Sequence, residues 1–296
     1  ATLDGHVGRF RGSDRRGRQS RAHRPGDFRR TGMKVTIIGG GVMGEAILGA
    51  ALERNVFDAA SVTVCELLEH RRAQLQSEYG VAVTTDSLAS MESADLVLLS
   101  VKPQDVHSVT GAIPPEALML SIMAGVRIPT LQKEFRHERI VRVMPNTPVA
   151  AKAGMSVWTA TKDVSDEQRT LARNLLGAIG REIYVEDEHK LDMATAVSGS
   201  GPGYVFLFIE AMIDGAVAIG LTRKQAEEMV LQTFLGSAVY AMASGKPAAE
   251  LRAMVTSPAG TTAAGLLELE HGAVRASILD CIQAAYARSV ELGGPA

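Results

Sequence analysis

The stretch Lys34-Val-Thr-Ile-Ile38 runs directly into Gly39-Gly-Gly41-Val-Met-Gly44. A β-branched strand that leads through G-x-G-x-x-G into a helix is typical of a dinucleotide-binding βαβ unit. Gly39 allows the tight turn, Gly41 lets the backbone approach a pyrophosphate, and Gly44 lets helix and strand pack closely. The helix N-terminus then faces the anion. We therefore predict a cofactor site in this turn.

The Gly39–Gly44 turn lies at the start of a longer segment in which predicted strands alternate with helices. From Met33 to about Val185, short β-branched runs alternate with helical stretches, which predicts a parallel, doubly wound sheet. The expected strands are KVTII, SVTVC, VAV, DLVLLSV, LMLSI, RIVRV, MSVWT and EIYV. Helices are expected near 42–54, 68–79, 129–136 and 166–180, the last opened by the capping box Ser165-x-x-Gln168. We assign residues 33–186 to an α/β Rossmann-type domain.

After about Val185 the strand patterns stop, and long helical stretches follow with Gly and Pro between them. A second capping box, Thr222-x-x-Gln225, opens a helix near 223–243, and a final helix is expected from about Val274 to Gly293-Gly294. Residues 187–296 are thus predicted to form an all-α domain. Its wide apolar stripes favour an oligomer interface.

The run YVFLFIEAMIDGAVAIGL (204–221) is the most apolar of these helices. Glu210 and Asp214 lie one helical turn apart on it, so we predict a buried helix with one polar edge in a soluble protein rather than a membrane span.

Charge is distributed unevenly along the chain. Residues 1–32 hold nine Arg, no Lys and three Asp, a charge of +6, and the remainder holds 22 basic against 30 acidic residues, a charge of −8. An acidic body argues against nucleic-acid binding. We expect residues 1–32 to be a disordered leader or a non-native extension ahead of Met33. Cys65 and Cys281 form no C-x-x-C pair, and the His spacing suits no metal, so we expect no metal site and a cytoplasmic location.

An acidic residue ends the second predicted strand. Glu66 lies 22 residues after Gly44, where its carboxylate would accept hydrogen bonds from the adenosine ribose of NAD. Arg71 and Arg72 follow and could pair with the 2′-phosphate of NADP. A solvated helix start is a third interpretation, and all three stay open.

Three further segments follow predicted strands. Ligands of open α/β sheets lie outside the carboxyl ends of the strands, so Ser100-Val-Lys-Pro103 and Met123-Ala-Gly125 are expected to line the cofactor. Asn146, in Arg142-Val-Met-Pro-Asn-Thr-Pro148, offers the donor and acceptor that a nicotinamide carboxamide needs. An ordinary Asn turn between two prolines is the alternative.

Two motifs stand out in the helical part. Val197-Ser-Gly-Ser-Gly-Pro-Gly203 is predicted to interrupt two helices. Val255-Thr-Ser-Pro-Ala-Gly-Thr-Thr262 runs into a helix and is typical of an anion cradle, with Gly260 allowing close approach and backbone N–H groups of Thr261 and Thr262 facing the ligand. A loop with a helix cap and no ligand is the alternative.

Taken in order, IGGGVMG, SVKPQ, SIMAGV, VRVMPNTP, SGSGP and VTSPAGTTAAGLLELE closely resemble the pyrroline-5-carboxylate reductases, from Met33 to about Leu292. The resemblance implies reduction of L-1-pyrroline-5-carboxylate to L-proline by NADH or NADPH, the last step of proline biosynthesis. It also implies homodimers joined through the helical domains, sites completed across subunits, and in many members rings of dimers. Gly203 departs from the family's usual Ala.

The resemblance also assigns roles to residues. The pyrophosphate is held by Gly39, Gly41, Val42 and Met43. The nucleotide is lined by Val101, Lys102, Pro103, Ala124 and Gly125. Substrate carboxylate and ring nitrogen are received by Ser257, Gly260, Thr261 and Thr262, and Thr262 is the residue expected to act in catalysis.

Another imine reductase or a β-hydroxyacid dehydrogenase of the same two-domain architecture is the competing prediction. The dehydrogenases need a Lys general acid on the helix after a Gly-rich loop, and the helix 204–221 contains no Lys. A cofactor-binding regulator without turnover would keep IGGGVMG but would not need SPAGTT.

Overall fold

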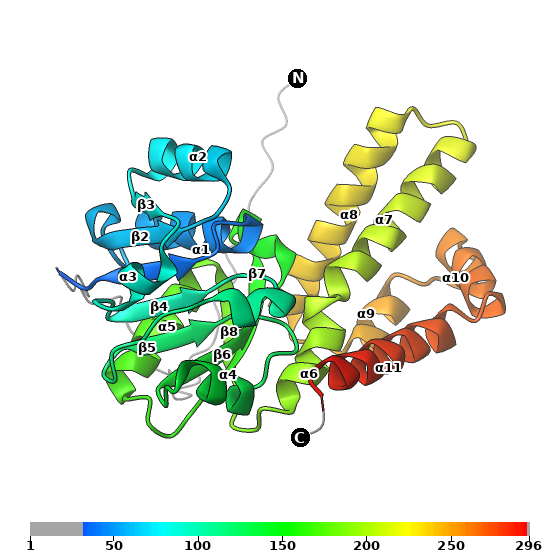
Figure 1. Cartoon of the computed structure of the whole chain (residues 1–296). Coiled ribbons are helices and arrows are strands. Elements are labelled where there is room, and N and C mark those ends of the chain that lie inside the picture. Colours follow the sequence, from blue (N-terminus) through cyan, green and yellow to red (C-terminus); the bar gives the residue numbers. More distant parts are fainter. Residues whose placement is uncertain (1–31, 295–296) are drawn as a thin grey trace, which may run out of the picture.

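The computed structural model describes residues 32–294 and has two parts, an α/β domain and an array of helices that projects from it (Figure 1). Residues 1–31, which make up the predicted leader except for its last residue, lie outside the described residues. The strands are β1 (Val35–Ile38), β2 (Val62–Cys65), β3 (Ala82–Thr84), β4 (Leu96–Leu99), β5 (Leu118–Ser121), β6 (Ile140–Met144), β7 (Gly154–Ala160) and β8 (Gly180–Tyr184). All eight coincide with the predicted β-branched runs, because each run is an apolar segment too short for a helix and bounded by polar or Gly residues.

The eight strands form one sheet of order β3-β2-β1-β4-β5-β6-β7-β8. The first six are parallel, as predicted. The expectation of an all-parallel sheet is wrong at one edge, since β7 pairs antiparallel with β6 and parallel with β8. Only a short 3₁₀ segment, Thr147–Ala151, lies in the link from β6 to β7. That link is too short for the crossover that a parallel pair requires.

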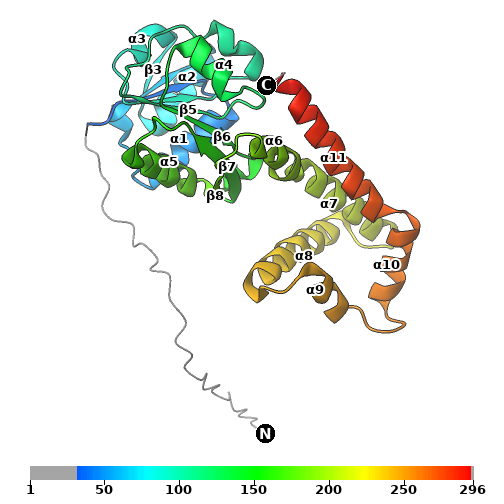
Figure 2. The ribbon, with the colours of Figure 1, turned by 90° about the horizontal axis from the view of Figure 1, so that it is seen from below.

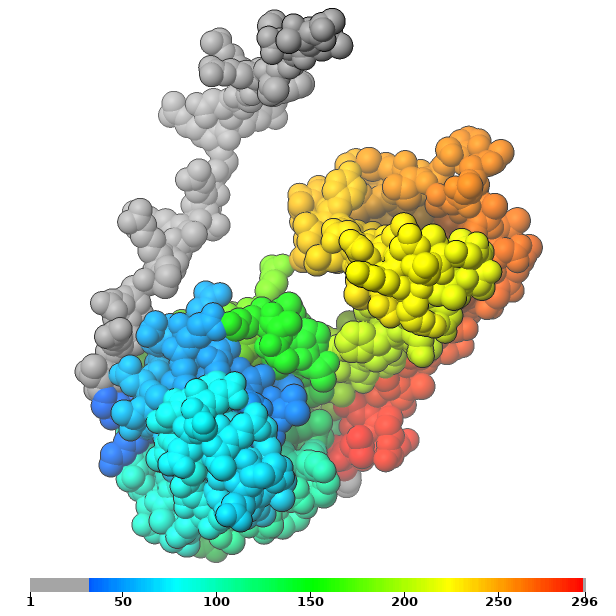
Figure 3. All heavy atoms as spheres, turned by 90° about the horizontal axis from the view of Figure 1, so that it is seen from above, coloured from blue at the N-terminus to red at the C-terminus, as the bar shows by residue number. Residues whose placement is uncertain are grey.

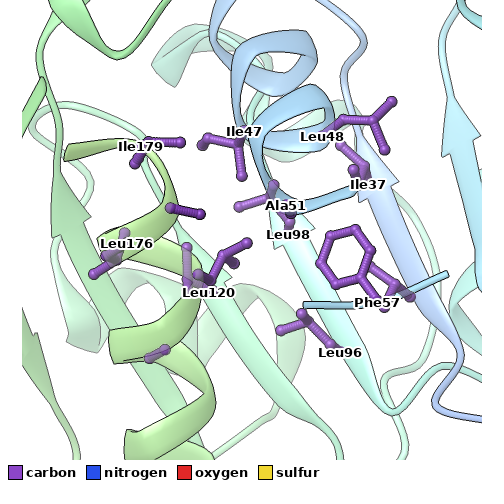
Figure 4. Close-up of a cluster of buried hydrophobic side chains, with 14 of the residues drawn as sticks. Ile37, Ile47, Leu48, Ala51, Phe57, Leu96, Leu98, Leu120, Leu176 and Ile179 are labelled. Carbon is purple, nitrogen blue, oxygen red and sulfur yellow. The ribbon is translucent and has the colours of Figure 1, made fainter. Parts of the chain in front are cut away.

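Helices cover both faces of the sheet. They are α1 (Val42–Glu53), α2 (Glu69–Tyr79), α3 (Ser87–Met91), α4 (Ile128–Phe135) and α5 (Asp166–Ala178). On one face Ile47 of α1 and Leu176 of α5 pack on Ile37 and Leu98 (Figure 4). On the other, Leu131 of α4 packs with Leu99 and its neighbours. Both capping boxes form as predicted, at Ser165 and at Thr222.

Only helices follow β8. They are α6 (Lys190–Ala194), α7 (Gly201–Ala218), α8 (Arg223–Ser244), α9 (Ala248–Met254), α10 (Thr261–His271) and α11 (Val274–Leu292). The segment Val197–Gly203 does not interrupt two helices, which corrects the prediction. A π-helical turn, Thr195–Gly199, joins α6 to α7, so Lys190–Ala218 is one helical segment. A π turn accommodates one extra residue without ending the helix.

The helical part buries little of its apolar surface in a single chain. Its described core cluster consists of Ile213, Ala226 and Val230 with partly buried neighbours. Phe206 and Leu207 of α7 are 60% and 64% exposed, so the prediction of a buried helix is wrong for the isolated chain. By length and composition alone, Lys190–Ala218 is the one helical segment among residues 32–294 that could cross a membrane. In Figure 3 the helical array extends away from the α/β domain.

Candidate active site

The Gly-rich turn has the geometry that the motif predicts. Gly39 adopts φ +97°, and a Cβ there would lie 2.9 Å from the Ser100 carbonyl carbon. A Cβ at Gly44 would collide with the Gly39 carbonyl oxygen, whereas a Cβ at Gly41 would meet open space. Gly41 is exposed, precedes α1 and has no side chain to cap that helix, so the first amides of α1 are open to an anion. These residues fit the pyrophosphate of a dinucleotide.

The carboxyl ends of the parallel strands meet beside this turn. Gly39 donates to the Cys65 carbonyl at 2.8 Å, and Ser100 donates from its backbone to the Ile38 carbonyl at 2.9 Å. The Ser100 hydroxyl also donates to the Gly39 carbonyl at 2.6 Å. The structure thus brings Val101 next to Gly39, where a Cβ on the glycine would lie 3.0 Å from Val101 Cγ1. Lys102 is exposed at the start of the following 3₁₀ turn, Pro103–Ser108.

Glu66 is held by backbone amides rather than standing free. Its Oε2 accepts from the Gly40 N–H and its Oε1 from the Leu68 N–H, both at 2.9 Å. The carboxylate therefore lies directly against the Gly-rich turn, in the place where a Rossmann acidic residue meets the ribose.

The two arginines after β2 are also engaged. Arg71 donates to the Gly40 carbonyl at 2.6 Å and forms a 2.7 Å ion pair with Glu45 in which both side chains are 19% exposed. Arg72 donates to the carbonyls of Glu66 and Leu67 at 2.8 and 2.7 Å. Arg71 thus fixes the Gly-rich turn itself, and Arg72 lies at its outer rim.

Two side chains beside these groups have raised pKa values. Burial and the Glu45 carboxylate raise the pKa of Tyr79, on α2, to about 12. Burial raises the pKa of the Cys65 thiol. Both groups therefore stay neutral at physiological pH and add no charge near the cofactor turn.

Asn146 uses its amide within the protein. Its Oδ1 accepts from the Met155 N–H at 2.8 Å and its Nδ2 donates to the Ser198 carbonyl at 3.1 Å. It joins the end of β6 to β7 and to the π turn of the helical part. Its contact with a nicotinamide remains a prediction, but the geometry gives it a bracing role that the sequence did not reveal. Ala124 and Gly125 follow β5, and Gly125 has φ +75°.

The predicted substrate residues lie elsewhere. Gly260 precedes α10, and a Cβ there would require the Ser257 hydroxyl to move. Thr261 and Thr262 occupy the exposed first turn of α10, as the motif predicts. In Figures 1 and 2, α10 lies at the end of the helical array that is remote from α1. Within one chain the structure does not bring Thr262 to the Gly-rich turn.

A cluster of charged residues between the two parts was not predicted from the sequence. It consists of the buried Arg142 and Asp192 and the partly buried Arg127 and Glu188, with Ser289. The available signal was Arg142 within the apolar strand RIVRV, because a buried Arg needs a carboxylate partner. Among residues 32–294, no group of three or more His, Cys, Asp or Glu side chains is arranged to hold a metal ion.

Comparison with known proteins covers nearly the whole described chain. Residues 188–292 match the family model for pyrroline-5-carboxylate reductase dimerisation, and residues 34–125 match that for NADP oxidoreductase, coenzyme F420-dependent. A pyrroline-5-carboxylate reductase of Synechocystis is 40% identical over 88% of this chain and 98% of its own length. One from Pisum sativum is 39% identical over 86% and 94%.

Solved structures agree. The pyrroline-5-carboxylate reductase of Coxiella burnetii has a TM-score of 0.80 and 33% identity, covering 89% of this chain and 99% of that one. The Plasmodium falciparum enzyme, solved with NADP bound, has a TM-score of 0.79 and 27% identity, with the same coverage. The dimerisation model on residues 188–292 accounts for the exposed apolar helices as a homodimer surface. The chain belongs to the pyrroline-5-carboxylate reductase family.

Proposed function

We propose that each active site combines the cofactor turn of one subunit with the α10 N-terminus of the other. The family activity is the reduction of L-1-pyrroline-5-carboxylate to L-proline with NAD(P)H, the last step of proline biosynthesis. The observation that carries the proposal is the position of α10, whose exposed first turn carries Thr262 and which lies remote from α1 of its own chain, the helix that follows the Gly-rich turn (Figures 1 and 2). A second copy docked on the helical part would bring the two halves together.

In the cofactor half, the exposed amides at Gly41, Val42 and Met43 hold the pyrophosphate. Glu66 meets the ribose, and the strand-end residues Val101, Lys102, Pro103, Ala124 and Gly125 line the nucleotide. When bound, NAD(P)H supplies the hydride. A Cβ at Gly41 would point into open space, and that space is where the pyrophosphate is expected to lie. The absence of a side chain at Gly41 therefore lets the turn fit this group.

In the substrate half, the backbone N–H groups of Thr261 and Thr262, in the first turn of α10, receive the carboxylate, with the Ser257 hydroxyl beside them. The Thr262 hydroxyl hydrogen-bonds the ring nitrogen and sets the plane of the C=N bond. A cyclic imine is already electrophilic, most so when protonated, so placement in line with the hydride donor supplies the main effect. No His or Lys acid is required.

The remaining assignments are the cellular location and the larger assembly. The proposal places the enzyme in the cytoplasm, consistent with the free thiols of Cys65 and Cys281. It includes no nucleic-acid partner and no membrane contact, because the apolar face of α7 is covered by the second subunit. Light scattering on the purified protein distinguishes a dimer from a ring of dimers.

The direct experiment is turnover of L-1-pyrroline-5-carboxylate by the purified chain, with NADH and NADPH in turn and proline identified as product. Small β-hydroxyacids with NAD⁺ serve as the competing substrates. Proline formation with no hydroxyacid oxidation supports the proposal. The reverse outcome would assign the chain to the competing dehydrogenase chemistry.

A further inference from the structure

A partly buried network of charges joins the two parts of the chain. Glu188 and Asp192, one helical turn apart at the start of the helical part, face two arginines of the α/β domain. Arg142 Nη1 lies 2.7 Å from Glu188 Oε1, and Arg127 Nη2 lies 3.5 Å from Asp192 Oδ2. The side chains of Arg142 and Asp192 are 4% and 2% exposed. None of these residues belongs to the site described above.

Glu188 ties the helical part to β6 and to the start of α4. The same Oε1 that pairs with Arg142 of β6 accepts from the Ile128 N–H at 2.8 Å. Ile128 is the first residue of α4, so the carboxylate also lies at a helix N-terminus, where a negative charge is favourable. Glu188 therefore fixes the segment that follows Gly125 as well as β6.

Asp192 ties in the last helix. Its Oδ1 accepts from the Ser289 hydroxyl at 2.9 Å, and its Oδ2 faces Arg127. Next to it, the C-terminal end of α11 packs on the cofactor segment, because a Cβ on Gly125 would lie 3.3 Å from the Leu292 carbonyl oxygen. Asp192 thus holds α11 against the segment that lines the nucleotide.

Helix α11 links the two functional segments of one chain. It begins just after α10, whose first turn carries Thr262, and it ends at Gly125 (Figure 2). A partly open pocket of about 180 Å³ is lined in part by Arg127, Arg142, Glu188 and Asp192. The two ion pairs beside it join the α/β domain to the start of the helical part.

Such a network adds little to the free energy of folding. Buried ion pairs lose much of their Coulomb attraction to desolvation, and well-packed apolar residues are often equally stable. We propose that Asp192 and Glu188 are positioning residues for hydride transfer. They hold the α/β domain at one orientation relative to the helical part of the same chain. Because the helical parts form the dimer, this orientation sets the distance between the cofactor of one subunit and the substrate on α10 of the other. This inference rests on the proposed function.

The test uses the full-length dimer with Asp192→Asn, which keeps the shape and the Ser289 hydrogen bond but removes the charge. A small misplacement of reacting groups lowers the rate steeply, so kcat should fall about 10-fold to 100-fold. The Kd for NADH, titrated by fluorescence without substrate, should stay within about twofold, because the Gly-rich turn is untouched. With NADH deuterated at the transferred hydrogen, the isotope effect on kcat should rise.

Arg127→Gln should repeat the loss, and Arg127→Lys should recover part of it. The matched control is Arg139→Gln, which removes a surface ion pair with Glu116 at 2.6 Å within the α/β domain and should leave kcat unchanged. Should Asp192→Asn fail to fold, Ser289→Ala removes only one hydrogen bond and should show a smaller effect of the same kind.

Asp192 and Arg127 variants that fold and keep the wild-type kcat and isotope effect would overturn the inference. A loss of activity that weaker NADH binding explains completely would also overturn it. Thr262→Ala is measured in the same assay. If Thr262→Ala is impaired while the Asp192 and Arg127 variants are not, the positioning role fails and the proposed function stands.

Discussion

Three glycines of the Gly39–Gly44 turn meet different geometric requirements. Gly39 needs its positive φ and Gly44 has no room for a Cβ, whereas Gly41 has room and is proposed to face the cofactor. Gly41 also has φ −70°, which any residue adopts. The first two glycines are thus required for folding, and the third for binding alone.

This difference gives a matched pair of variants. Gly44→Ala should destabilise the protein by about 1–3 kcal/mol through overpacking and weaken cofactor binding with it. Gly41→Ala should leave the melting temperature unchanged but weaken NAD(P)H binding at least about tenfold. Thermal melts and cofactor titrations check both. Gly177→Ala in α5, where a Cβ also meets open space, is the control that should lose neither stability nor cofactor affinity. Equal stability losses in the Gly41 and Gly44 variants would contradict the assignment.

Thr262 is the residue on which the substrate half depends most. Thr262→Ala removes the hydroxyl and keeps the backbone amide, so the carboxylate cradle survives while alignment of the C=N bond is lost. A hydrogen bond to a charged group contributes about 1.5–3 kcal/mol, so kcat/KM should fall about 10-fold to 150-fold. Steady-state kinetics measure this, and NAD(P)H affinity should not change.

Thr262→Ser is the matched variant because it retains the hydroxyl, and it should keep most of the activity. An Ala variant within about twofold of wild type would remove the assigned role. A Ser variant as slow as the Ala variant would assign the effect to packing of the γ-methyl group instead.

At the scale of elements, the turn from β2 into α2 separates two arginines that the sequence could not distinguish. Arg71 holds the Gly40 carbonyl and Glu45, whereas Arg72 donates to two carbonyls at the rim. We expect both cofactors to be used. Arg71→Ala should weaken NADH and NADPH alike, and Arg72→Ala should weaken NADPH selectively. Titrations of both cofactors decide this, and an unchanged NADPH affinity in Arg72→Ala would show that Arg72 only holds the backbone after β2.

Most helices and strands could be predicted from local sequence patterns. The errors arise where the structure depends on a contact with a distant residue, or on the length of a link or helix. The strand MSVWT was expected, but its direction depends on the short link after β6. Helix α3 was missed because its five residues carry no full amphipathic repeat. The glycines of the SGSGP segment predict a break between two helices. In the structure, Asn146 donates to the Ser198 carbonyl and the helix continues through a π turn.

The whole molecule shows why half of the site could not be located from one sequence. Motifs identified the Gly-rich turn, Glu66 and the start of α10 with their local geometry. No local sequence pattern predicts that α10, which carries Thr262, is remote from the Gly-rich turn of its own chain, or that Asp192 pairs with Arg127. Both depend on how the two parts are oriented, which buried pairs from distant segments determine.

The same scale predicts the consequence of losing the dimer. Leu207 on α7 and Leu235 on α8 are 64% and 59% exposed in the single chain. A buried charge without a partner is costly, so Leu207→Glu or Leu235→Glu should favour monomers. Light scattering should show the change, turnover should be lost, and NADH should still bind. Ile183→Glu, on the 51% exposed Ile183 of β8, is the control and should remain a dimer. Full activity in a monomeric variant would contradict a shared site.

The most direct measurement is the activity of a mixed dimer, purified with two tags, of one Gly41→Glu subunit and one Thr262→Ala subunit. Glu at position 41 places a negative charge where the pyrophosphate is expected, so the Gly41→Glu homodimer should be nearly inactive, and the Thr262→Ala homodimer should be impaired about 10-fold to 150-fold. In the mixed dimer, one site combines the intact cofactor turn of the Thr262→Ala subunit with the intact α10 of the other. The account predicts about half of the wild-type activity per dimer. A mixed dimer as inactive as the two homodimers would show that each chain builds its site alone, and would contradict the account.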